Sequence, residues 1–320
     1  MIPTLSAATP AQNESMAFSL WWWRRGWSSS VKRLLSNLPL KPLVPTLCLG
    51  AAVVYGLADK LQDFVAGIFI PQYHYPYAVA LCFAQVLISL LFLNLLHVVG
   101  LVPLKPYSRP LGERLLVPSI CGSVHAVLVM WAKASSWSAG LFPLTLPLLP
   151  PLTAAFGFAL KLSTAPSFHI SVLISIVSGT SIVIRASQGL SSAEPLEYFY
   201  APLALILFGV CLTWLAKVSE SEHHRSPDAP TSAFDLYYTQ LVNQSWVLGL
   251  LWLLHVDGPW LVLSQGSWHS LLFHGFLLAI LLLGMVLDFL LCMAALCVSP
   301  FTAALIHSAR EIAQSLVPLL

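Results

Sequence analysis

The sequence predicts an all-α integral membrane protein, and three observations lead to that fold class. Hydrophobic residues make up 58% of the chain and charged residues only 9%. The mean hydropathy is +0.81. Soluble domains carry roughly 25% charged residues, so this chain lacks the polar surface that water requires. Finally, nine stretches are apolar over the length of about 20 residues that a helix needs to cross a bilayer.

We expect these nine stretches to form transmembrane helices, in the order in which they occur along the chain. They lie near Leu43–Phe64, Pro76–Val99, Leu115–Ala134, Ala139–Leu160, Phe168–Ile184, Tyr200–Val218, Tyr237–His255, Leu271–Leu296 and Pro300–Leu320. Residues 1–42 precede them and are basic and aromatic, without the apolar core of a cleaved signal peptide. The chain therefore divides into a tail over residues 1–42 and a transmembrane domain over residues 43–320.

The distribution of Lys and Arg predicts the orientation of these helices. Nearly all basic residues of the connecting segments fall on the side of the N-terminus, whereas the opposite side receives only Arg185. Positive charges are enriched in cytosolic loops, so the N-terminus is expected in the cytosol.

The fourth and ninth helices begin alike, which indicates an internal repeat. Each follows a very short hairpin and has a proline near its start, Pro143 in one and Pro300 in the other. A proline is tolerated there because its missing N–H would have no partner anyway. Matching interrupted helices in two halves are typical of inverted-repeat transporters. We expect five-helix repeats over about residues 43–186 and 198–320, with the second incomplete and a tenth helix expected to follow.

No catalytic or metal-binding pattern accompanies this architecture. Ser123 and His125 are two residues apart and do not share a helix face. His307 and Glu311 share a face, but two ligands without a third make a poor metal site. The net charge of +2 and the absence of a basic run interleaved with aromatic residues argue against nucleic-acid binding. We expect no enzymatic activity, no cofactor, no metal and no nucleic-acid partner.

What remains is a set of polar groups within the apolar stretches. They are Asp59, Lys60, Asp63, His125, Lys133, Tyr237, Tyr238, Asp288, His307, Arg310 and Glu311. An Arg within a transmembrane helix costs at least ~2.5–3.5 kcal/mol, so it normally faces a partner or a water-filled cavity. Arg310 could therefore contact a polar solute, or it could pair with Glu311 or a neighbouring helix and only fix the packing. Lys60, Lys133 and Arg310 together could neutralise a phosphate-bearing solute, while Lys60 and Lys133 could instead extend to the membrane interface.

Four short motifs resemble the nucleotide-sugar and triose-phosphate transporters of solute carrier family 35, in the drug/metabolite transporter superfamily. Lys60 followed by Tyr75-Pro76 resembles the junction of the family's first two helices, and Lys133 resembles the lysine that ends its third. Leu236-Tyr237-Tyr238 resembles the opening of its seventh helix. The segment from Ser299-Pro300-Phe301-Thr302 to Arg310-Glu311 resembles its ninth.

The resemblance implies ten helices in two inverted five-helix repeats, here with nine, and transport by alternating access. It implies antiport of a nucleotide sugar or related organic phosphate against a nucleoside monophosphate, across the Golgi or ER membrane, with a homodimer as a candidate assembly. The residues it points to for substrate binding are Lys60, Lys133, Tyr237, Tyr238, Thr302, His307, Arg310 and Glu311. Glu311 and Pro150-Pro151 depart from the family pattern. These departures favour the alternative of a divergent, non-transporting membrane protein that acts through protein interactions.

Overall fold

The computed structural model describes residues 40–73, 77–135, 141–187, 196–225, 231–255 and 258–316, and these residues contain helices but no strands. The expected tail, residues 1–42, lies almost entirely outside this range, as do residues 317–320. The helices are α2 (Leu40–Tyr73), α3 (Ala78–Val98), α4 (Arg109–Arg114), α5 (Leu116–Ser135), α6 (Leu141–Thr145), the 3₁₀ turn η1 (Leu146–Leu148), α7 (Leu149–Ala159), α8 (Phe168–Ser187), α9 (Glu197–Arg225), α10 (Ala233–Leu254), α11 (Pro259–Gln265), α12 (Leu271–Cys297) and α13 (Pro300–Leu316).

A helix occurs at each of the nine expected places, but fewer than nine qualify as membrane spans by length and apolarity. In the described part of the chain six helical segments qualify, or seven if α10 and α11, which meet at 78°, count as one broken span. The six do not include α2 or α13. Helix α2 contains Asp59, Lys60 and Asp63, whereas α13 contains Arg310 and Glu311 and is described over only 17 residues. The protein is thus a multi-pass membrane protein with two additional, more polar helices.

Prolines and capping residues explain where several of the helices begin or break. The fourth expected helix is divided into α6, η1 and α7, and prolines lie in all three parts. Each proline removes one backbone donor, which weakens a continuous α-helix. At the start of α13, the Ser299 hydroxyl accepts a hydrogen bond of 3.0 Å from the backbone N–H of Thr302, an N-cap that precedes Pro300.

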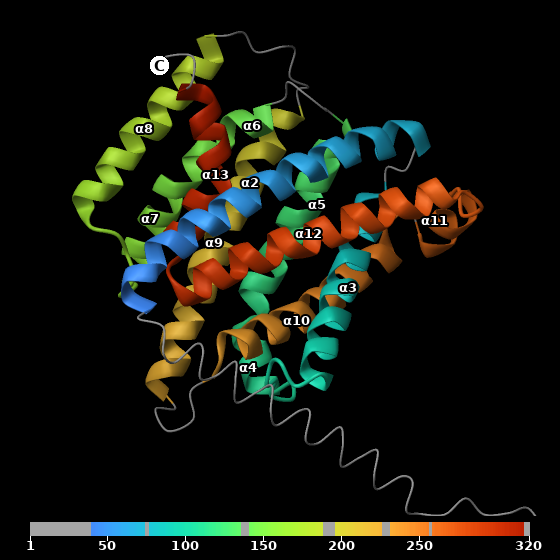
Figure 1. The fold of residues 1–320 in the computed structure, drawn as a ribbon, viewed down its shortest axis with the longest axis horizontal. Helices are drawn as coiled ribbons and strands as arrows, with labels where there is room; N and C mark the ends of the chain where they lie inside the picture. The colour runs from blue at the N-terminus through green and yellow to red at the C-terminus, as the bar shows by residue number, and fades with distance from the viewer. Residues whose placement is uncertain are drawn as a thin grey trace, which may run out of the picture.

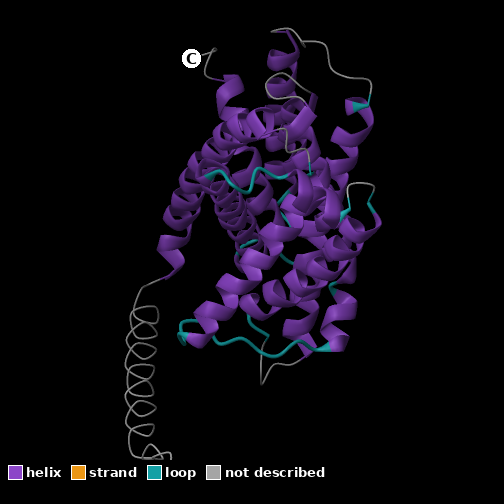
Figure 2. Cartoon of the chain, turned by 90° about the vertical axis from the view of Figure 1, so that its right-hand side faces the viewer, coloured by secondary structure: helices purple, strands orange, loops and turns teal. Residues whose placement is uncertain are grey.

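The helices pack in pairs that join the first part of the chain to the second (Figure 1). Helix α5 packs on α9, and α2 packs on α12, along which it runs at the front of Figure 1. Helices α3 and α10 pack together, as do α7 and α13. Helix α9 is the most enclosed of the membrane spans, with 61% of its apolar window buried, whereas α8 at the edge has 17%. A view turned by 90° shows that the bundle is elongated (Figure 2).

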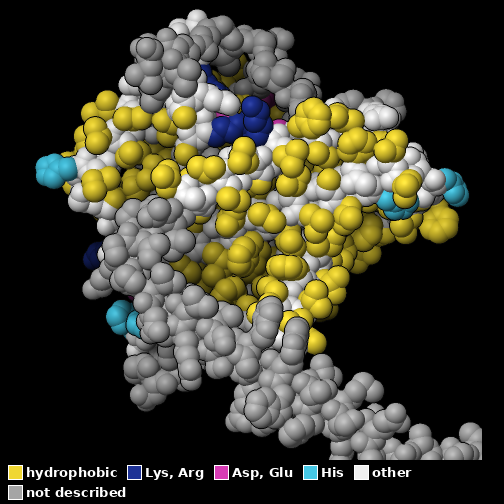
Figure 3. Space-filling model, in the orientation of Figure 1, with side chains coloured by type: hydrophobic (Ala, Val, Ile, Leu, Met, Phe, Trp, Pro, Cys, Tyr) yellow, Lys and Arg dark blue, Asp and Glu magenta, His cyan; other side chains and the backbone are white. Residues whose placement is uncertain are grey.

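The outer surface of the bundle is suited to lipid. Large apolar side chains such as Leu57, Leu91, Phe199 and Leu254 are exposed, each by more than half of its surface. The described part of the face drawn in Figure 3 carries many hydrophobic side chains, and a small group of Lys and Arg atoms lies near the top. Contiguous apolar surface of this extent is unfavourable in water but not in a bilayer.

Candidate functional site

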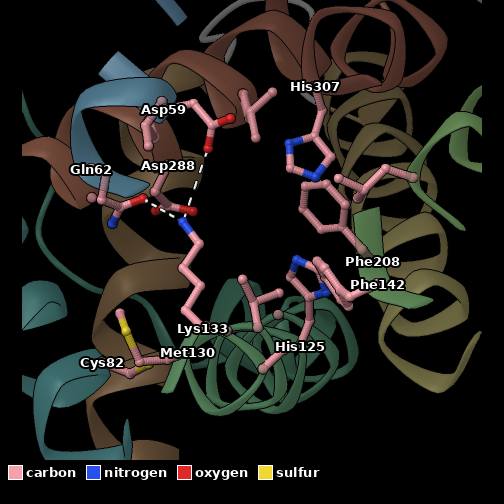
Figure 4. A pocket seen from close by; sticks show the side chains of 18 of the residues that line it. Asp59, Gln62, Cys82, His125, Met130, Lys133, Phe142, Phe208, Asp288 and His307 are labelled. Carbon is pink, nitrogen blue, oxygen red and sulfur yellow. Dashed lines mark hydrogen bonds and ion pairs between the residues drawn. The ribbon is translucent and has the colours of Figure 1, made fainter. Parts of the chain in front are cut away.

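A cavity of about 880 Å³ lies in the middle of the bundle (Figure 4). Side chains from α2, α3, α5, α6, α8, α9, α10, α12 and α13 line it, so both halves of the chain contribute. Its volume is within the range of pockets that enclose a metabolite-sized ligand.

One part of the cavity wall is a network of ion pairs between α2, α5 and α13. The guanidinium Nη1 of Arg310 lies 2.6 Å from Asp59 Oδ2 and 2.9 Å from Asp63 Oδ2. The ammonium of Lys133 lies 3.0 Å from Asp63 Oδ1 and also donates to Gln62 Oε1 at 3.0 Å. These side chains are only 19–30% exposed, so each charge depends on its partners rather than on water.

The network continues to α8 through Glu311. The Glu311 carboxylate is paired with the guanidinium of Arg185, and it also lies 3.6 Å from Arg310 Nε. Arg185 in addition donates to Ser315 Oγ at 2.9 Å and to Gln314 Oε1 at 3.2 Å. Because α2, α5, α8 and α13 each contribute charged residues, the network fixes these four helices relative to one another.

Two further carboxylates line the cavity without a cationic partner in the described residues. Asp288 on α12 accepts a hydrogen bond of 3.1 Å from the Tyr237 hydroxyl, and the thiol of Cys292 lies 3.8 Å from its other oxygen. Glu197 at the start of α9 is 1% exposed and accepts one hydrogen bond, from the backbone N–H of Phe142 at 3.1 Å. Both are held by neutral donors only, so neither carboxylate has a cationic partner among the described residues.

Aromatic and imidazole rings lie across the cavity from Asp59, Gln62, Lys133 and Asp288 (Figure 4). The His125 ring stacks on Phe208, with centroids 4.2 Å apart and planes 7° from parallel. His307 meets Phe208 edge-on at 5.1 Å, and its Nδ1 forms a 2.5 Å hydrogen bond with the Tyr55 hydroxyl. The cavity therefore has a charged side and an aromatic side.

Several polar atoms around the cavity have no hydrogen-bond partner within the described protein. They are Ser123 Oγ, Glu197 Oε2, Gln240 Oε1, His307 Nε2 and Arg310 Nε, all in residues that line the cavity. A buried polar atom without a partner costs free energy, and such atoms are rare in folded proteins. Their accumulation around one cavity indicates a site that accommodates a polar molecule.

The structure brings four of the eight sequence-predicted site residues together at this cavity. Lys133, His307, Arg310 and Glu311 all line it. Contrary to the interfacial alternative, Lys133 turns inward to Asp63 rather than extending to the membrane interface. Lys133 and Arg310 both already contact carboxylates, which compete with any anion for these two cations.

The other four predicted residues do not line the cavity, and their assignment to substrate binding stays a prediction. Lys60 is exposed, because it lies about 100° around α2 from Asp59. Tyr237 is buried behind Asp288, which it orients, and Tyr238 packs against the hydrophobic core. Thr302 belongs to the N-terminal turn of α13, where its hydroxyl lies 2.8 Å from that of Ser299.

Sequence reasoning overlooked the uncharged polar residues of the cavity and two of its charged ones. Gln85 and Ser89 on α3, like Gln240 and Gln244 on α10, are four residues apart and line the cavity from apolar helices. Polar residues at this spacing share one helix face, which is the signal that could have identified them. The two charged residues are Glu197 and Arg185, of which Arg185 was interpreted only as a loop charge.

The described residues contain no group of three potential metal ligands. Comparison of the chain with protein-family models gave no match, and comparison with curated proteins gave none either. The resemblance to solute carrier family 35 therefore stays a prediction from four short motifs.

Proposed function

We propose that this protein is a transporter that moves a small polar solute across a membrane by alternating access, with the central cavity as its solute site. The observation that carries the proposal is the cavity itself, about 880 Å³ within a membrane-embedded bundle and lined by buried charged groups. Ionisable residues inside a membrane are costly, and they mark solute and ion pathways more often than structural contacts.

The pattern of helix packing supports an inverted repeat, which alternating access would use. The correspondence between the halves pairs α2 with α9, α3 with α10, α5 with α12, and α6–α7 with α13. When the halves are exchanged in this way, the α5–α9 contact becomes the α12–α2 contact. The same exchange maps α7–α9 onto α13–α2, and α10–α5 onto α3–α12. Two such halves can rock about a site at their interface.

The solute expected from the sequence is a nucleotide sugar or organic phosphate, exchanged for a nucleoside monophosphate in the Golgi or ER. Asp59 and Asp63 both contact Nη1 of Arg310, so a phosphate would have to bind the remaining donors of this guanidinium beside two carboxylates. The geometry thus supports a transporter better than it supports this class of solute, and the organelle stays a prediction of the resemblance.

A non-transporting membrane protein is the second candidate, and one observation favours it. Lys133, Arg185 and Arg310, the cations of the cavity, all form internal ion pairs. Such a closed network could serve only to hold α2, α5, α8 and α13 together.

Uptake into proteoliposomes distinguishes the two candidates. Labelled nucleotide sugars, sugar phosphates, neutral sugars and organic cations would be offered to vesicles preloaded with nucleoside monophosphate or with the unlabelled solute. Lys133→Gln is compared with Lys60→Gln, because the two lysines differ in whether they line the cavity. We expect accumulation of at least one solute, lost in Lys133→Gln and retained in Lys60→Gln. If correctly folded protein accumulates none of them, the transporter proposal fails.

A further inference from the structure

The charges around the cavity identify the kind of solute that it would accept. Among the described residues that line it are five carboxylates and three cations. The carboxylates are Asp59, Asp63, Glu197, Asp288 and Glu311, and the cations are Lys133, Arg185 and Arg310. With neutral histidines the cavity has a formal excess of two negative charges. A pocket of low dielectric constant and negative sign concentrates cations and repels anions.

The excess of carboxylates over cations can be assigned to two residues. Asp59, Asp63 and Glu311 share contacts with the three cations, which leaves Glu197 and Asp288 as the carboxylates without a cation. The carboxylate of Asp288 is held in place by the Tyr237 hydroxyl, a hydrogen bond that orients it but adds no positive charge. An incoming cationic group would supply the compensation that this carboxylate lacks.

Two features of the cavity wall agree with a cationic solute. Gln240 and Glu197 are each 1% exposed and leave the acceptor oxygens Oε1 and Oε2 without a donor. Opposite Asp288, the ring of Phe208 lines the cavity, with His125 stacked on one of its faces and His307 edge-on to it (Figure 4). An aromatic face attracts a cation through its quadrupole, most strongly where water is excluded.

We propose that the transported solute is an organic cation, either an ammonium or a positively charged heteroaromatic compound. The carboxylate of Asp288 on α12 binds its positively charged group, on the side of the cavity opposite the Phe208 ring. This inference rests on the proposed transport function and departs from the phosphate-bearing solute that the sequence suggests. Phosphate would meet a cavity with more carboxylates than cations, in which each cation already contacts a carboxylate.

Three pyridine derivatives that differ mainly in charge test the proposal directly. They are 1-methylnicotinamide, a cation, nicotinamide, which is neutral, and nicotinate, an anion. Thermal stabilisation of the purified full-length protein is measured with each compound. We expect stabilisation by 1-methylnicotinamide at a concentration at least about tenfold lower than by either of the others. Equal or stronger stabilisation by nicotinate, or none by the cation at millimolar concentration, would overturn the proposal.

Variants assign the effect to Asp288. Asp288→Asn preserves the shape and the acceptor for Tyr237 but removes the charge, and it should weaken cation binding by about tenfold or more. Glu113→Gln is the matched control, because Glu113 is an exposed carboxylate on α4 whose partner is Arg109. It should leave binding unchanged. Unchanged cation binding in folded Asp288→Asn would also overturn the proposal.

Uptake measurements distinguish a failure of the cation assignment from a failure of the proposed transport function, on which this inference rests. Transport of nicotinate or a sugar phosphate in preference to the cation overturns the charge assignment and leaves transport standing. Charge-selective binding that depends on Asp288, without uptake of any solute, overturns transport and retains the assignment of the site.

Discussion

Replacing Arg310 by Gln tests whether the ion-pair network stabilises the helix bundle. The substitution removes two charge-assisted contacts, to Asp59 at 2.6 Å and to Asp63 at 2.9 Å, and leaves both carboxylates dependent on Lys133. Removing one partner of a fully buried pair costs about 3–5 kcal/mol. These side chains are 23–30% exposed, and water screens part of that energy, so we expect a loss of about 2 kcal/mol.

A double-mutant cycle isolates the interaction from the loss of the side chain. Arg310→Gln, Asp59→Asn and the double variant are unfolded with SDS in mixed micelles, and the free energies of unfolding are compared. We expect the double variant to be more stable than the sum of the single effects predicts, with a coupling energy of about 1–2 kcal/mol. Lys60→Gln, which alters an exposed neighbour on α2, should stay within about 0.5 kcal/mol of wild type. Additive effects at Arg310 and Asp59 would refute the reasoning.

Two further predictions concern the hydroxyl groups of Tyr237 and Ser299. Tyr237→Phe removes the hydroxyl that donates to Asp288. It should destabilise the protein by about 1–2 kcal/mol in the same unfolding assay. Asp288→Asn in the Tyr237→Phe background should restore part of this stability, because a neutral amide loses less than a carboxylate when the hydroxyl donor is removed. Ser299→Ala removes the N-cap of α13 and should cost about 1 kcal/mol, while Ser299→Thr, which keeps the hydroxyl, should cost less. Wild-type stability of Tyr237→Phe or of Ser299→Ala would contradict the contact concerned.

The helices could be predicted from the sequence because a bilayer demands long apolar segments. Helix α12 covers Leu271–Cys297, close to the expected Leu271–Leu296. Helix α8 covers Phe168–Ser187, close to the expected Phe168–Ile184. The 3₁₀ break between α6 and α7 was not expected, because proline is common in membrane helices and its spacing alone does not reveal where hydrogen bonds are lost. The short helices α4 and α11 lie in connections for which apolar length gives no signal.

The site was only partly predictable, because a sequence shows which residues are charged but not which of them meet. Arg310 was recognised as costly in a membrane, yet its partners Asp59 and Asp63 lie about 250 residues away in the chain. Lys60 was chosen over its neighbour Asp59, although only Asp59 lies on the face of α2 that lines the cavity. The family resemblance drew attention to cations. The carboxylates that neutralise them became apparent only when the helices were packed together.

The accessibility of Ser123 to water-soluble reagents tests the central claim, that the cavity is a solute site opening to both sides of the membrane. Ser123 on α5 lines the cavity, and Ser178 on α8 does not, although both hydroxyls are buried in membrane helices without a hydrogen-bond partner in the described structure. Each serine is replaced by cysteine in a background whose native cysteines are alanine, and sealed vesicles are treated with a membrane-impermeant thiol reagent from either side. We expect Ser123→Cys to react from both sides and to be protected by a transported solute, and we expect Ser178→Cys not to react. Reaction of Ser123→Cys from neither side, or at the same rate as Ser178→Cys, would contradict it.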